Sequence, residues 1–329
     1  MKRTFYFQNN PIIISASSVA GPKECAGEVG AFIDVKLDED TFGESSYEKA
    51  EIKMLYTAVK NSLDKANLKE EDINCLIAGD LLNQIISSTF SARSLNMGYL
   101  GVYNACSTFT EAIILGATFV DGNKMEKVVC ATSSHFSSAE RQYRYPLELG
   151  STRPPQSQWT ITGAGGLVIA SEGIGPKIKV ATVGKVVDFG VTDANNMGAA
   201  MAPATADTIF THFVETNRTP DYYDIIVTGD LGALGSRLFK ELLREKGYDV
   251  EKQHVDCGEL IYNICEDEYQ GGCGAGCVSV VFCSYLMQML KEKKINKMLL
   301  VATGALLSPL SSQQGESIPG IAHAVALEN

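Results

Sequence analysis

The residues best placed to do chemistry lie in Asn104-Ala-Cys106-Ser-Thr-Phe-Thr, where a turn of small residues leads into a helical pattern. Apolar residues follow at positions 109, 112, 113, 116, 117 and 120, the spacing of one buried helix face. Cys106 is therefore expected at the first turn of a buried helix, where free N–H groups and the positive end of the helix dipole gather. Such a position can lower a thiol pKa and create a nucleophile or an anion contact. The alternative is a buried structural cysteine.

The turn that carries Cys106 lies in a region of the chain where predicted strands and helices alternate, and these elements must hold it in place. Tyr47 to Ala66 has the pattern of an amphipathic helix, and Cys75-Leu-Ile-Ala and Lys127-Val-Val-Cys-Ala-Thr have that of short buried strands. Residues Lys23 to Glu44 are polar, contain glycine and are expected to form an extended loop. Strands and helices of these lengths that alternate along the chain predict a mostly parallel, doubly wound α/β sheet.

The pattern occurs twice along the chain. Asp224-Ile-Ile-Val-Thr-Gly229-Asp230-Leu resembles Cys75-Leu-Ile-Ala-Gly79-Asp80-Leu, and Gly271-Gly-Cys-Gly-Ala-Gly-Cys277 precedes another apolar helical segment. The interval from Cys106 to Ala131 is 25 residues, and so is the interval from Cys277 to Ala302. We therefore predict a duplicated α/β unit, with one half over residues 1–173 and the other over residues 174–329.

Composition excludes several classes of protein. The chain of 329 residues is 45% apolar and 20% charged, as soluble globular proteins are. It contains neither an apolar run near the roughly 18 residues of a membrane span nor an N-terminal signal segment. A formal net charge of −11 argues against nucleic acid and against adhesion to an anionic membrane. An anionic ligand would therefore need local donors or a cation carried with it.

The nine cysteines are scattered along the chain and do not have the regular spacing of a disulfide framework, which fits free thiols in a reducing compartment. Cys273 and Cys277 are four apart, but they lack both a second pair at metal spacing and a nearby histidine. We therefore expect neither a zinc site nor any other metal site built by the protein.

Several long motifs resemble one branch of the thiolase-like superfamily, the stage V sporulation protein AD family of spore-forming bacteria. They are Ala20-Gly-Pro-Lys, Ala78-Gly-Asp-Leu-Leu-Asn-Gln84, Ala105-Cys-Ser-Thr108, Ala131-Thr-Ser-Ser-His135, Ala139-Glu-Arg-Gln-Tyr-Arg-Tyr-Pro146, Met197-Gly, Ala200-Met-Ala-Pro203, Ala302-Thr-Gly-Ala-Leu-Leu-Ser-Pro309, Glu316-Ser-Ile-Pro and Ile321-Ala-His323. The resemblance covers nearly the whole chain. It implies the duplicated five-layer α/β/α/β/α fold of thiolases and ketoacyl synthases.

The resemblance also implies a function. Members of the family bind dipicolinic acid (pyridine-2,6-dicarboxylate), which spores accumulate with calcium, and act with SpoVA membrane proteins to move it into the developing spore. We accordingly expect a homodimer on the cytoplasmic face of the spore inner membrane, with no cofactor except calcium carried with the ligand. The aspartate, cysteine and histidine of the family match Asp80, Cys106 and His323.

Other residues near these motifs are candidate ligand contacts. Ser107 and Thr108, with the N–H groups of their turn, could bond one carboxylate. Arg141 and Arg144, three apart, could offer a bidentate fork to the other, although this spacing also fits a solvated helix face. His135 and Asn83 are weaker candidates.

Two of the matched residues have alternative roles. An ionised Asp80 would repel a dicarboxylate unless it is neutral, held by hydrogen bonds or shares a calcium ion with the ligand. Our hypothesis is that a hydrogen bond holds it and that it orients the pocket, while it could also cap the next helix. His323 could pair with Cys106 or donate a proton to a carboxylate, or it could be a satisfied buried histidine.

An alternative function is a condensing enzyme or acyltransferase of the thiolase type that acts on acyl-CoA thioesters through Cys106. Such enzymes also use a histidine, and a second histidine or an asparagine, on loops of the second half. Those loops carry Gly229-Asp230 and Gly271-Gly-Cys-Gly-Ala here, so the ordinary catalytic set is missing. A third possibility is a scaffold with a vestigial pocket. We favour the binding protein.

Overall fold

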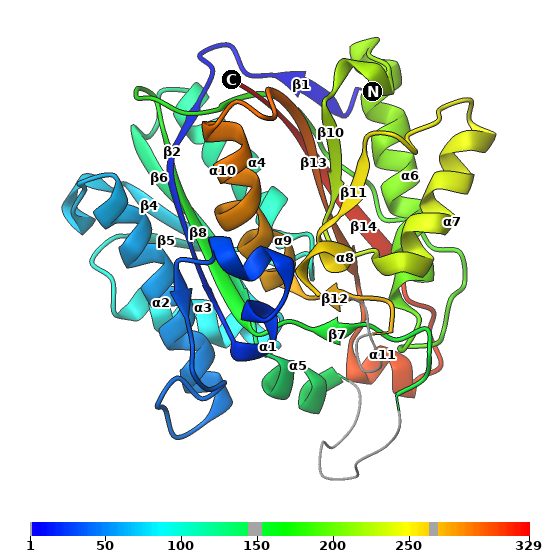
Figure 1. Cartoon of the computed structure of the whole chain (residues 1–329), viewed down its shortest axis with the longest axis horizontal. Helices are drawn as coiled ribbons and strands as arrows, with labels where there is room; N and C mark the ends of the chain where they lie inside the picture. Colours follow the sequence, from blue (N-terminus) through cyan, green and yellow to red (C-terminus); the bar gives the residue numbers. More distant parts are fainter. Residues whose placement is uncertain (1, 144–152, 263–268) are drawn as a thin grey trace.

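The computed structural model describes residues 2–143, 153–262 and 269–329. These residues form one twisted sheet of 12 strands, flanked by helices and divided by a central helical layer (Figure 1). Its main path runs β5 (Gly98–Gly101), β4 (Cys75–Gly79), β6 (Lys127–Ser134), β8 (Gly163–Ala170), β2 (Ile12–Ala20), β9 (Lys177–Thr182), β14 (Gly320–Glu328), β13 (Lys297–Ala305), β10 (Ile225–Thr228) and β11 (His254–Asp256). In addition, β1 (Thr4–Tyr6) pairs with β9, and β3 (Val35–Lys36) pairs with β2.

The two halves of this path have the same topology. The order β5-β4-β6-β8-β2 in the first half corresponds to β11-β10-β13-β14-β9 in the second. In each half the first three strands are parallel and the last two are antiparallel to their neighbours. The halves meet where Ile12 pairs with Lys177. The predicted boundary between residues 173 and 174 falls in the loop between β8 and β9, and remains a prediction.

The expectation of a mostly parallel sheet is wrong, because the sheet is mixed. After β6 and β13 the chain turns back at the same end of the sheet, through the short helices α5 (Phe136–Tyr143) and α11 (Pro309–Gln313). The returning strands β8 and β14 therefore run antiparallel to the strands that precede them.

Helices form three layers that enclose the sheet halves (Figure 1). In the first half, α2 (Tyr47–Lys65) and α3 (Ile86–Arg93) cover the outer face of the sheet, and in the second half α6 (Met197–Thr216) and α7 (Gly232–Glu245) cover the opposite outer face. Between the halves lie α4 (Thr108–Asp121) and a continuous helix made of α9 (Ala275–Val281), η6 (Phe282–Leu286) and α10 (Met287–Lys291). The rings of Phe109 and Phe282 meet there with centroids 5.8 Å apart. This confirms the five-layer fold.

Local sequence explains where most elements begin. Ser46 caps α2 by accepting a hydrogen bond from the N–H of Lys49, and the helix predicted over Tyr47 to Ala66 is confirmed. The expectation of an extended loop over Lys23 to Glu44 is wrong in part. Pro22 starts α1 (Pro22–Cys25), which is followed by η1 (Glu28–Phe32) and β3, and all three elements are too short to show a periodic pattern.

The remaining elements are short. They are β7 (Trp159–Thr160) and β12 (Gly272–Cys273), which pair in a separate two-stranded sheet, α8 (Cys257–Ile261), and the single turns η2 (Glu70–Asp72), η3 (Asn83–Ile85) and η5 (Pro220–Tyr222). Among the helices within the described ranges, none is long and apolar enough to pass through a lipid bilayer.

Candidate functional site

Cys106 lies at the base of a narrow cavity of about 40 Å³ at the end of the central helical layer. Its turn is fixed by two hydroxyls that bond to backbone oxygens just before the helix: Ser107 Oγ donates to Asn104 O (2.9 Å) and Thr108 Oγ1 donates to Ala105 O (2.6 Å). Ala105 has φ of +50°, a left-handed conformation that is strained for residues other than glycine. Helix α4 begins at Thr108, so Cys106 precedes its first turn.

The cavity is lined from both halves of the chain. Its walls are Leu81, Tyr103, Ala105, Cys106, Ala139, Glu140, Tyr143, Thr160, Met197, Cys273, Gly274, Ala305 and Leu307. A larger groove of about 430 Å³ adjoins it and shares Tyr103, Tyr143 and Leu307 with it. Binding sites for small molecules usually measure roughly 300 to 1,000 Å³, so the groove has the size of such a site and the cavity extends it.

The residue that most affects Cys106 is Asp230, which follows β10 in the second half. Its side chain is 1% exposed. Its Oδ1 accepts a hydrogen bond from Thr303 Oγ1 (2.5 Å), and its Oδ2 accepts one from the N–H of Gly274 (3.0 Å). The negative charge of this carboxylate acts on the Cys106 thiol. Burial raises the pKa of Asp230 to about 6 despite these donors.

Of the two alternatives for Cys106, a thiol with a lowered pKa and a buried cysteine, the structure favours the buried cysteine. Burial raises this pKa well above its ordinary value, and the negative charge of Asp230 and the nearby Cys273 thiol raise it further. The N–H of Gly274 acts in the opposite direction but is outweighed. At neutral pH Cys106 is therefore a neutral thiol, since a helix end stabilises a thiolate only where it is not opposed by burial and like charge.

Asp80 lies beside the cavity without lining it. Its side chain is fully buried, its Oδ1 accepts from the N–H of Leu82 (2.8 Å), and its Oδ2 accepts from the N–H and the hydroxyl of Ser88 (both 2.7 Å). Burial raises the pKa of Asp80. Because Ser88 is in the first turn of α3, Asp80 stabilises the start of that helix, which agrees with the prediction that it could cap the next helix.

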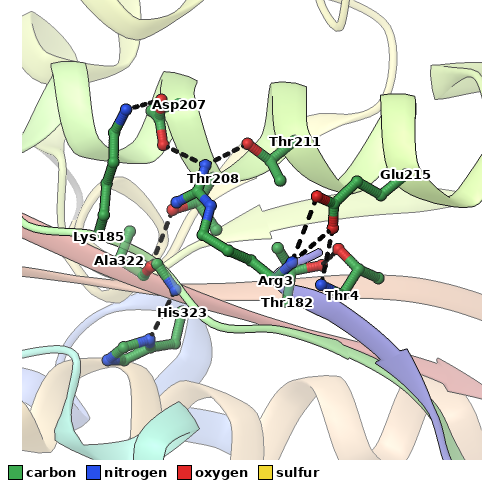
Figure 2. Close-up of polar contacts among 11 residues, drawn as sticks. Arg3, Thr4, Thr182, Lys185, Asp207, Thr208, Thr211, Glu215, Ala322 and His323 are labelled. Atoms are coloured by element: carbon green, nitrogen blue, oxygen red, sulfur yellow. Dashed lines mark hydrogen bonds and ion pairs between the residues drawn. The ribbon is translucent and has the colours of Figure 1, made fainter. Parts of the chain in front are cut away.

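His323 is on β14 and also lies outside the lining of the cavity. Its Nδ1 accepts a hydrogen bond from the N–H of Gly184 (3.0 Å), and its Nε2 lies 3.3 Å from the side-chain amide of Asn104. Figure 2 shows its ring on the side of β14 opposite to Thr208 and Asp207. Burial lowers the pKa of His323 to about 4, so the imidazole is neutral at pH 7. It therefore supports the turn that carries Cys106.

The structure does not bring the polar side chains of the flanking motifs to the cavity. The hydroxyls of Ser107 and Thr108 are buried and bonded within their own turn. His135 is buried with its Nε2 2.9 Å from Asp40 O, while its Nδ1 accepts from the N–H of Ser137. Burial lowers the pKa of His135.

The two arginines and Asn83, which were predicted as possible ligand contacts, differ in where they lie. Arg141 is exposed and forms an ion pair with Glu48, so it does not line the cavity. Arg144 lies outside the described residues. Asn83 is exposed and lines the adjoining groove.

Sequence reasoning missed the residues that complete the cavity. Asp230 was visible as the counterpart of Asp80 in the repeat, but only a histidine or an asparagine was sought in its loop. Glu140 and Tyr143 lie on α5, and Tyr103, which is 37 positions before Glu140, meets them only through the fold. The Thr160 hydroxyl donates to Glu140 (2.9 Å), and Arg153 pairs with the same carboxylate at 3.4 Å.

The charge of the site is unusual for an anion receptor. Among the described residues, neither the cavity nor the groove has a lysine, arginine or histidine in its lining. The described part of the chain also contains no cluster of three His, Cys, Asp or Glu side chains that could hold a metal ion. The described residues of the site thus supply neutral donors, aromatic rings and one carboxylate.

Comparison with solved structures identifies the fold. The chain is similar to 3-oxoacyl-[acyl-carrier-protein] synthase III from Aquifex aeolicus, with a TM-score of 0.59 and 14% identity over 97% of this chain and 100% of that one. It is also similar to a variant of OleA from Xanthomonas campestris, with a TM-score of 0.66 and 13% identity over 98% of this chain and 99% of that one. At such low identity these likenesses show a thiolase-like fold alone.

Sequence comparison gives a more specific result. Stage V sporulation protein AD of Bacillus subtilis (strain 168) is 45% identical over 327 residues, which cover 99% of this chain and 97% of the relative. The family model for stage V sporulation protein AD matches residues 1–328. The chain therefore belongs to the stage V sporulation protein AD family.

Proposed function

We propose that this protein binds dipicolinic acid, with calcium, and serves its uptake into the developing spore together with SpoVA membrane proteins. Family membership supports a role in sporulation. The observation that carries the ligand proposal is the junction of the cavity and the groove, where Cys106 lies below a space bordered by Tyr103 and Tyr143. A flat pyridine ring fits between aromatic side chains.

The charge of the site favours the calcium chelate over the free dianion. Glu140 is the carboxylate of the cavity, and basic side chains are missing from the described lining. A dianion placed there would meet no basic group in the described lining, because the Arg153 guanidinium is already paired with Glu140 at 3.4 Å, and it would be repelled by the net charge of −11. A 1:1 chelate of Ca²⁺ with the dicarboxylate is neutral, and its remaining coordination positions can accept oxygen ligands.

Within this proposal the three residues matched to the family have different roles. Cys106 contacts the ligand as a neutral thiol from the base of the cavity. Asp80 orients the loop of Leu81 and Leu82, which line the cavity and the groove. His323 orients Asn104 in the turn that carries Cys106. Asp80 and His323 thus support the walls of the site.

Calorimetric titration with dipicolinate, with and without equimolar calcium, tests the proposal. We expect binding in the presence of calcium, weaker binding without it, and loss of binding in Ala139→Leu, which fills the cavity. Cys106→Ala should weaken binding, and Cys130→Ala, a matched change at a buried cysteine away from the cavity, should not. Isophthalate, which lacks the ring nitrogen, should not compete. Binding that Ala139→Leu leaves intact would place the ligand elsewhere.

The role in uptake can be tested separately in spores. We propose that the protein acts on the cytoplasmic face of the inner spore membrane as a peripheral partner of SpoVA proteins. Spores that carry Ala139→Leu should then contain little dipicolinate, while Cys130→Ala spores should contain the normal amount. Normal content in a triple Ala replacement of Asp80, Cys106 and His323 would instead indicate a scaffold with a vestigial pocket.

We propose that the protein is not a condensing enzyme. A condensing enzyme is considered because the chain has a fold similar to those of 3-oxoacyl-[acyl-carrier-protein] synthase III and OleA. Against it, the charge of Asp230 opposes a thiolate at Cys106, and the four histidines of the chain are buried or partly buried with other partners. An acyl group found on Cys106 by mass spectrometry after incubation with acyl-CoA would overturn this statement.

A further inference from the structure

Two consecutive residues beside the groove have a backbone conformation that their side chains disfavour. Gln84 (φ +56°, ψ +24°) and Ile85 (φ +47°, ψ +50°) are both left-handed. Among the described residues other than glycine, Ile85 is the only β-branched residue with a left-handed φ, and the two form the only consecutive pair. A left-handed β-branched residue is strained and persists only where the surrounding structure holds it.

One side chain, Asp80, anchors both ends of this strained loop, which we define as residues 82–85. Its Oδ1 accepts from the N–H of Leu82 at the start of the loop, and its Oδ2 accepts from the N–H of Ser88 in the first turn of α3. Because Asp80 is fully buried, both anchor points are fixed. The residues between them can therefore change conformation while β4 and the body of α3 stay in place.

The middle of the strained loop is held weakly. The N–H of Asn83 donates to Gln142 Oε1 on α5 at 3.3 Å, and Gln142 Nε2 is buried without a partner in the described part of the chain. The Ile85 side chain occupies the space that a Cβ at Gly101 of β5 would need. A long hydrogen bond and one apolar contact are little support for two strained residues.

The strained loop is also one wall of the groove that adjoins the cavity. All four of its residues line the groove, which shares Tyr103 and Tyr143 with the cavity. In the left-handed form Asn83 and Gln84 are exposed, so the groove is open to solvent on this side. A change of conformation in the loop therefore changes the width of the groove.

We propose that the strained loop is a lid of the groove. Its left-handed form is the open form, and the bound ligand favours a closed form in which Gln84 and Ile85 have left the left-handed region. Release of the strain on closure then adds to the affinity for the ligand, because a ligand shifts a conformational equilibrium by its preference for one of the two states. The inference rests on the proposed function for the identity of the ligand and adds a conformational step to it.

Gln84→Gly tests the lid, because glycine takes the left-handed conformation without strain and Gln84 is exposed. The variant stabilises the open form, so calorimetry should show dipicolinate with equimolar calcium binding at least about threefold more weakly than to the wild type. In the free protein, hydrogen exchange of the peptide over residues 81–88 should slow at least about threefold, because the open form is left less often.

Lys293→Gly is the matched control, since Lys293 is also left-handed (φ +56°) and exposed but does not line the groove. It should change neither the affinity nor the exchange of this peptide. If Gln84→Gly does not fold, Gln84→Asn should shift both in the expected direction, because asparagine also tolerates a left-handed φ.

Unchanged affinity in Gln84→Gly would mean that the bound state keeps the strain, and it would overturn the inference. Tighter binding in this variant, or exchange that does not slow, would overturn it as well. Failure of the wild type to bind dipicolinate would refute the proposed function, and the exchange measurement would then decide by itself whether the strained loop opens and closes.

Discussion

Replacement of Asp80 by alanine separates a structural role from direct contact with the ligand. The Asp80 carboxylate accepts from the N–H groups of Leu82 and Ser88 and from the Ser88 hydroxyl, at 2.7 to 2.8 Å, in a fully buried setting. Alanine leaves two buried N–H groups without their acceptor, while the hydroxyl can rotate toward another. We therefore expect a loss of stability together with a displaced loop over residues 81–85.

The expected loss follows from these contacts. Each orphaned buried N–H costs about 1–3 kcal/mol, and relief of the buried charge returns part of the sum, since burial raises the pKa of Asp80. A net loss of about 3 kcal/mol results. With about 2.1 cal/mol/K of unfolding entropy per residue, the 329 residues lose about 4 °C in melting temperature.

Differential scanning calorimetry at pH 7 measures this loss. Asp80→Asn keeps one acceptor oxygen and should lose roughly half as much. Asp38→Ala, at an exposed aspartate, should stay within about 0.5 kcal/mol of the wild type. An unchanged melting temperature for Asp80→Ala, combined with abolished ligand binding, would refute the reasoning and make Asp80 a direct ligand contact.

Three further outcomes are expected. Burial raises the pKa values of Glu24 and Asp256 to about 7, so the native state holds protons that the unfolded chain has released. The melting temperature should therefore rise as pH falls from 8 to 6, and Glu24→Gln should make this dependence weaker. A melting temperature that rises toward pH 8 would contradict the prediction. His323→Phe removes the acceptor of the Gly184 N–H and should lower the free energy of unfolding by about 1–3 kcal/mol, measured by calorimetry. The affinity for dipicolinate should change less than about tenfold, and complete loss of affinity would make His323 a ligand contact. Light scattering should show a homodimer that Leu100→Asp dissociates, since β5 is an edge strand with Leu100 exposed.

The fold was predictable because its signals are local and repeated. The amphipathic pattern of α2 and the apolar strands β4 and β6 are visible in short windows, and the equal intervals after Cys106 and Cys277 reveal the repeat. The direction of β8 and β14 was not predictable, because a strand pattern does not specify which neighbour it pairs with.

The candidate site was predictable only in part. A turn of small residues before a helix is a local signal, and it placed Cys106 at a helix start; the family resemblance placed it in a pocket, and Cys106 does line the cavity. Its pKa is raised first by burial and then by the charge of Asp230, which is 124 positions away in sequence, and no local pattern reports either effect. Asp80 and His323 were assigned to the ligand through the family, whereas their hydrogen bonds are to the protein.

The repeat explains why equivalent aspartates differ in role. Asp80 and Asp230 each follow a glycine at the end of corresponding strands, β4 and β10. In the first half, Asp80 serves the helix that follows, through the N–H of Ser88. In the second half that task belongs to Asp256, whose carboxylate accepts from Leu231 and Gly232 at the start of α7. Asp230 instead accepts from the N–H of Gly274, the residue before α9, and from the hydroxyl of Thr303 on β13, so this aspartate fixes the part of the cavity wall that Gly274 forms.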